Sequence, residues 1–138
     1  MGKINWGRVI LGGLLAGLVV NVFEAASGIF LQQQYEAAMA ALGKTMQTSA
    51  AVYYIVYGFI YGIFAIWFYA AIRPRFGPGP KTALCAGVAV WLVGYLLPMI
   101  GYAASGLFPV NLVAIGCVVG LVETIVGTLL GARIYTEV

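Results

Sequence analysis

The sequence predicts an all-α polytopic membrane protein with four transmembrane helices in an antiparallel bundle. Charged residues make up 8% of the 138 residues, against about 25% in an ordinary soluble domain. The mean hydropathy is +1.01, and a soluble chain of this length could not cover so much apolar surface with so few charges. Four apolar segments are each long enough to cross about 30 Å of hydrocarbon at about 1.5 Å per residue.

These segments form a single four-span membrane domain over residues 1–138. The segment after the first span is polar but rich in helix-forming residues. It therefore predicts a short helical extension or an interfacial helix near 32–43, which ends at Gly43. The spans are expected near residues 9–31, 51–72, 82–104 and 110–133.

Prolines shape the remaining connections. RPRFGPGP (73–80) holds three of the five prolines and is not expected to continue a helix, and SGLFP (105–109) reads as a tight turn. Pro98 lies inside the third span. There it is expected to kink the helix and to free the carbonyl group of Gly94.

The positive charges predict the orientation of the chain. Lys44 falls on one side of the four-span arrangement, and the other six cationic residues fall on the opposite side. Since Lys and Arg are retained on the cytoplasmic side, both termini and the 73–81 segment should be cytoplasmic. The six residues on that side are Lys3, Arg8, Arg73, Arg75, Lys81 and Arg133.

Several classes of chemistry find no support in the residues. The chain has no histidine, which excludes histidine-ligated haem and histidine acid–base catalysis within it. Cys85 and Cys117 should differ in depth by roughly 15 Å at about 1.5 Å per residue, too far for a disulfide. No Cys, Asp and Glu grouping has the spacing of a metal site, and no nucleophile has a base partner. We therefore expect no enzymatic activity, no bound metal and no nucleic-acid partner.

Glycines share one face with a carboxylate in both the first and the fourth span. Residues spaced three or four apart lie on one stripe of a helix, and small residues there let helices in lipid approach closely. Because Glu24 and Glu123 lie on these stripes, we expect both carboxylates to be buried in protein. The expected packing stripes contain Gly13, Gly17 and Gly28 in the first span and Gly116, Gly120, Gly127 and Gly131 in the fourth.

The two acids are expected at different depths. The helical rise places Glu24 roughly 22 Å and Glu123 roughly 10 Å from the cytoplasmic edge, so a carboxylate dyad is not expected. Buried tyrosine hydroxyls need acceptors, which predicts polar clusters around each acid. The cluster around Glu24 is expected to contain Asn21, Tyr57 and Tyr95. The second, around Glu123, is expected to contain Thr124, with Thr128 and Trp91 nearby.

Three functions are compatible with this pattern. The favoured one is a non-enzymatic accessory or scaffold subunit of a larger membrane complex, or a homo-oligomer, because the short loops leave no extramembrane domain for chemistry. The second is a small proton-coupled exporter in which Glu24 binds a proton or a cation, a plan that resembles the small multidrug-resistance exporters. The third is a lipid, quinone or pigment site in an aromatic groove between the second and third spans. The expected partners are membrane lipids and either other membrane subunits or a second copy of the chain. No cofactor is expected apart from the lipid, quinone or pigment of the third function.

Two stretches carry a resemblance to known sequences. INWGRVILGGLLAGLVVNVFE and YAAIRPRFGPGPKTALCAGVAVW resemble small uncharacterised bacterial four-helix integral membrane proteins. The resemblance implies a location in the bacterial inner (cytoplasmic) membrane. It implies no activity and no functional residues.

Overall fold

The computed structural model describes residues 2–138 and contains helices but no strand in that range. Four helical stretches are long and apolar enough to cross a membrane, at Trp6–Phe30, Ala50–Phe76, Pro80–Ala104 and Val110–Ala132. The predicted four-span, all-α class is therefore confirmed. The helices are α1 (Trp6–Phe30), α2 (Gln32–Ala41), α3 (Ala50–Phe76), α4 (Pro80–Trp91), the π-helical turn η1 (Leu92–Leu96), α5 (Leu97–Ala104) and α6 (Val110–Ala132).

The helix ends follow local backbone chemistry. Asn5 caps α1, since its side chain accepts a hydrogen bond from the backbone N–H of Arg8 at 3.2 Å. The expectation that the helix would stop at residue 73 is wrong, because α3 runs on through Pro74 to Phe76. A proline removes a single backbone donor, and the helix ends only where Gly77 adopts a φ of 83°.

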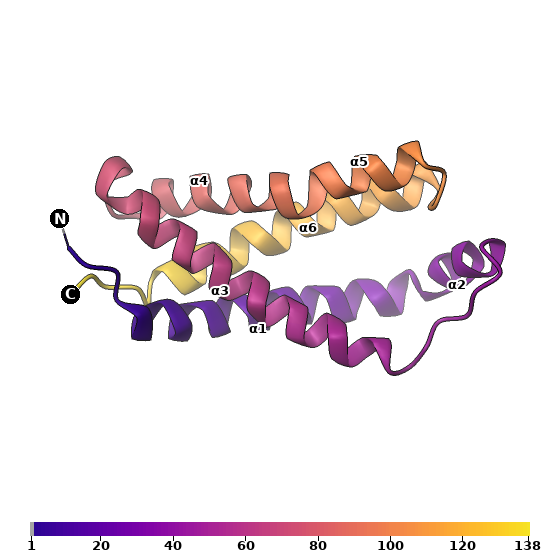
Figure 1. Cartoon of the computed structure of the whole chain (residues 1–138), viewed down its shortest axis with the longest axis horizontal. Helices are drawn as coiled ribbons and strands as arrows, with labels where there is room; N and C mark the ends of the chain where they lie inside the picture. Colours follow the sequence, from indigo (N-terminus) through magenta and orange to yellow (C-terminus); the bar gives the residue numbers. More distant parts are fainter. Residues whose placement is uncertain (1) are drawn as a thin grey trace.

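Helix α1 packs against α3 and α6, which also contact each other, and α4 packs against both α6 and α3. Figure 1 shows both termini and the α3–α4 connection at one end of the bundle, here called the terminal end. Helix α2 and the α5–α6 turn lie at the other end, here called the distal end. At the terminal end the backbone N–H of Asn5 donates to the Tyr135 hydroxyl at 3.4 Å, which holds the two ends of the chain together.

Glycines bring α1 and α3 into direct backbone contact. A methyl group added at Gly17 would lie 2.7 Å from Cα of Phe59, and one added at Gly62 would collide with the backbone of Gly13 and Gly17. The predicted stripe on α1 thus packs against α3. Sequence reasoning did not single out the complementary glycines of α3, Gly58 and Gly62.

A second close contact sets the register between α1 and α6. A methyl group added at Gly12 would lie 2.5 Å from the carbonyl oxygen of Gly131, and one added at Gly127 would lie 3.0 Å from the carbonyl oxygen of Ala16. Only the distal-end glycines of the two predicted stripes take no part in packing. A methyl group at Gly28 or at Gly116 would meet nothing within 4 Å.

Buried side chains concentrate toward the terminal end. One core cluster joins Val9, Ile66 and Tyr69 with the small residues Ala83 and Ala86. Toward the distal end, η1 and α5 contain no buried residue, and residues 51–57 of α3 are all exposed. The bundle is therefore tightly packed at one end and loosely packed at the other.

The third span changes its helical pitch in front of Pro98. Residues Leu92–Leu96 form a π-helical turn, and the backbone N–H of Leu97 donates to the carbonyl oxygen of Leu92, five residues earlier. A π-helical turn widens the hydrogen-bonded ring locally and often occurs at functional sites. It carries Tyr95, the residue around which the candidate site is built.

Candidate intramembrane acid pair

Two carboxylates from different helices meet at one tyrosine hydroxyl. The Tyr95 hydroxyl lies 2.5 Å from Oε1 of Glu24 and 2.5 Å from Oε1 of Glu123. The acids come from α1 and α6, and the tyrosine comes from η1. The three side chains are here called the acid pair and its bridging tyrosine.

The prediction that the two acids are too far apart in depth to associate is wrong. Gly12 packs on Gly131 and Ala16 on Gly127, so Glu123 lies level with about Val20. Glu24 is then only one helical turn further along, about 6 Å. Two glutamate side chains and a tyrosine span that distance. The sequence estimate failed because it took helix ends, and not glycine contacts, as the reference for depth.

The two acids differ in burial. Glu123 is 0% exposed, and its second oxygen, Oε2, is buried without a hydrogen-bond partner. Glu24 is exposed, which contradicts the expectation that it would be buried in protein. Glu24 lies beyond Gly17, the last glycine of the α1 stripe that closely contacts another helix. The pair therefore has one buried and one accessible carboxylate.

Glycines and tyrosines hold the bridging tyrosine in place. The ring of Tyr95 lies over Gly120, where an added methyl group would be 2.5 Å from its Cδ1. Tyr61 packs edge-on against Tyr95 with ring centroids 5.8 Å apart. The hydroxyls of Tyr61 and Thr124 are hydrogen-bonded at 3.1 Å. Tyr61 lies in turn over Gly94. Sequence reasoning expected Thr124 beside Glu123 but did not assign Tyr61 to the cluster.

Two expected members of the cluster lie apart from the acids. Asn21 donates from Nδ2 to the carbonyl oxygens of Gly17 at 2.9 Å and of Ile55 at 3.2 Å, so it joins α1 to α3. Tyr57 is 51% exposed and stacks on Tyr61 with ring centroids 6.0 Å apart. Neither side chain forms a hydrogen bond with Glu24 among those found in residues 2–138.

No cation balances the acid pair within the described residues. The salt bridge found among residues 2–138 lies at the terminal end, where it joins Arg73 to Glu137 at 3.9 Å. The described residues also contain no group of three or more His, Cys, Asp or Glu that could hold a metal ion. On α2, burial raises the pKa of Tyr35, and the nearby Glu24 carboxylate raises it further.

One arrangement of protons satisfies both contacts of the Tyr95 hydroxyl. Hydrogen bonds from one hydroxyl oxygen to two carboxyl oxygens, each at 2.5 Å, need two hydrogen atoms. A phenol supplies only one of them. A protonated carboxyl group can supply the other by donating to the tyrosine oxygen. In that arrangement the acid pair holds one proton and a net charge of −1.

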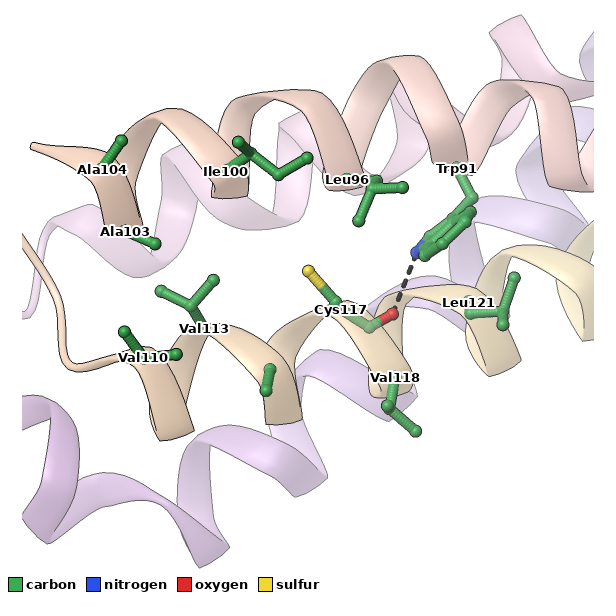
Figure 2. Close-up of a pocket in the computed structure, with 11 residues that line it drawn as sticks. Trp91, Leu96, Ile100, Ala103, Ala104, Val110, Val113, Cys117, Val118 and Leu121 are labelled. Carbon is green, nitrogen blue, oxygen red and sulfur yellow. Dashed lines mark hydrogen bonds between the residues drawn. The ribbon is translucent and has the colours of Figure 1, made fainter.

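Trp91 occupies a different place from the one expected. Its indole N–H donates to the carbonyl oxygen of Cys117 at 2.9 Å, between α4 and α6, and not to Glu123. Beside this bond lies an apolar cavity of about 650 Å³ between the third and fourth spans, shown in Figure 2. The groove expected from the sequence was placed between the second and third spans.

Comparison of the chain with models of protein families, with curated proteins and with solved structures finds no match. The resemblance to small bacterial four-span proteins therefore stays a prediction. What the chain does has to be inferred from its own residues.

Proposed function

We propose that this integral membrane protein is a small proton-coupled transporter, in which the acid pair exchanges its proton for a cationic solute. The observation that carries the proposal is the tyrosine hydroxyl held between two carboxyl oxygens, an arrangement that one proton on the acid pair would satisfy. An ionisable residue inside a membrane is costly and is by default a candidate for function. The absence of enzymatic activity and of a bound cofactor is part of the proposal.

Charge balance couples the proton to the solute. If the shared proton left alone, two negative charges would remain in a low-dielectric region with no described lysine or arginine beside them. Uptake of a monovalent cation restores the net charge. Glu24 is the exposed member, so it meets the solute, while Glu123 is buried and senses it through Tyr95.

The proposed location follows the charge distribution. Six of the seven cationic residues belong to the terminal end by sequence. The positive-inside rule then places both termini in the cytoplasm and Glu24 in the half of the membrane away from it. The resemblance noted above supports a bacterial inner membrane.

Replacing Glu24 with glutamine should abolish transport without unfolding the protein. The amide keeps the size of the side chain but cannot release a proton. We would measure proton flux with a pH-sensitive dye in vesicles that carry the purified protein and a pH gradient, and start it by adding ethidium as the cationic probe. The wild type should dissipate the gradient when ethidium is added, and the Glu24→Gln variant should not.

The matched control is Glu36→Gln. Glu36 lies on α2 and accepts a hydrogen bond from Gln32 at 2.8 Å, outside the predicted spans. This variant should behave as the wild type does. Equal proton flux in Glu24→Gln and wild type would exclude Glu24 from coupling, and a wild type that moves neither protons nor ethidium would overturn the transport proposal.

A second candidate function is an accessory subunit or a homo-oligomer. Its support is the loosely packed distal end, where α5 has no buried residue and a methyl group added at Gly28 or Gly116 would meet nothing within 4 Å. Small residues left free in this way are surfaces on which another membrane helix can pack.

Native mass spectrometry of the protein released from lipid nanodiscs tests this second candidate. A subunit should emerge with other chains at fixed stoichiometry, and a homo-oligomer should emerge as a multiple of its own mass. The Gly116→Leu variant should lose that association, because its side chain would fill the free surface. A protein that is monomeric at all concentrations would contradict the subunit interpretation and leave the transporter proposal unaffected.

A further inference from the structure

An apolar groove of about 650 Å³ lies between η1–α5 and α6, separate from the acid pair. In Figure 2 Leu96 and Ile100 on one wall point toward Val113 and Cys117 on the other. The walls of the groove include three small residues. These small residues are Ala103, Ala104 and Ala114.

The lining selects an apolar occupant. All its side chains are apolar apart from the indole N–H of Trp91 and the thiol of Cys117. The indole N–H already donates to the carbonyl oxygen of Cys117, so it is not free to recognise a polar ligand. The turn at the mouth of the groove carries no charge either, since residues 97–112 contain no Lys, Arg, Asp or Glu.

The length of the groove matches one leaflet of a membrane. On α6 its lining runs from Val110 to Leu121, which is about 16 Å at about 1.5 Å per residue. Half of a hydrocarbon core about 30 Å thick is about 15 Å. A lipid chain that enters at the α5–α6 turn would therefore end near Trp91, where the indole bond to Cys117 joins the two walls.

The volume argues against a helix as the occupant. A helix is about 10 Å across, so a 16 Å length of it would take up about 1,300 Å³. This is about twice the volume of the groove. A single flexible chain, which needs no internal hydrogen bonds, fits a space of this shape better.

We propose that this groove binds one acyl chain of a membrane phospholipid from the leaflet on the side of the α5–α6 turn. The site recognises the chain and is indifferent to the headgroup, since no charged side chain lies at its mouth. The bound chain fills the space between α5 and α6 and so supports η1, the turn that carries the bridging tyrosine.

Quenching of Trp91 fluorescence by brominated lipid tests the proposal. The Trp6→Phe and Trp67→Phe substitutions leave Trp91 as the single tryptophan. The protein is reconstituted in phosphatidylcholine vesicles in which a fraction of the lipid carries bromine at the middle and lower part of its chains. We expect strong quenching that saturates at a low brominated fraction. The same chains on phosphatidylethanolamine or phosphatidylglycerol should quench equally, and methyl-branched chains should compete poorly.

A filling substitution and a matched control make the test specific. Ala114→Phe fills the groove from α6, and Ala103→Phe fills it from α5 should the first variant misfold, as judged by circular dichroism and gel filtration. Ala25→Phe adds the same group at an exposed position on α1. Quenching should be lost in the filling variants and retained in the control. Equal quenching in the filling variants and the control would overturn the proposal. No quenching of Trp91 in the wild type would also overturn it, because no lipid chain would then lie against the indole.

Discussion

Replacing Gly62 with valine should prevent α1 and α3 from packing and should destabilise the protein more than any other single change considered. Even one methyl group at this position would collide with the backbone of Gly13 and Gly17, which cannot move aside as a flexible side chain could. Overpacking a core typically costs about 1–3 kcal/mol, and a collision between backbones should exceed that range. Unfolding of the reconstituted protein in increasing SDS, followed by circular dichroism, measures the loss.

The control for this substitution is Gly28→Val. Gly28 lies on the same helix as Gly13 and Gly17, but a side chain there would meet nothing within 4 Å. Its unfolding midpoint should stay close to that of the wild type. A Gly62→Val protein as stable as the Gly28→Val protein would show that α1 and α3 are not in backbone contact.

Replacing Tyr95 with phenylalanine should disable the acid pair while leaving the fold in place. The ring still packs on Gly120, but both carboxyl groups lose the hydroxyl they share. Leaving the buried Glu123 carboxyl group without this partner costs about 1–3 kcal/mol. Infrared spectroscopy follows the carbonyl stretch of the protonated carboxyl group, which should be present in the wild type at neutral pH and should shift in this variant. Proton flux with ethidium should be lost.

Tyr57→Phe is the matched control. Tyr57 lies one turn from Tyr61, is largely exposed and contributes no hydrogen bond to the acids. Its carboxyl band and its proton flux should equal those of the wild type. If the wild type shows no protonated carboxyl band, the shared proton inferred from the geometry is absent.

The fold class could be predicted from the sequence because lipid imposes a simple rule. Every backbone polar group must be satisfied within a span, so long apolar segments become helices. The helix ends were harder to place, as at Pro74, because a proline near the end of a helix removes only one donor. The π-helical turn could not be located either. Pro98 signalled irregular backbone there, but not which residues would adopt the wider turn.

The candidate site was harder to predict from the sequence than the fold class. The glycine spacing predicted that Gly13 and Gly17 contact another helix, and both lie against α3. The spacing did not predict which helix each face would contact. Depth estimates carry an error of about one turn, and one turn decides whether Glu24 and Glu123 lie apart or share Tyr95. A signal was nevertheless present. Tyr95 was the one tyrosine expected in the third span near the depth of Glu24, and it is the residue that reaches both acids.

The position of the two chain ends has a consequence for how such a protein can evolve. The ends lie together at the terminal end, where Asn5 contacts Tyr135. An even number of spans returns the chain to the side on which it began. A gene duplication that fused two copies through a short linker would therefore give two units with the same orientation, the parallel type of internal repeat. An inverted repeat would need an additional membrane crossing between the copies.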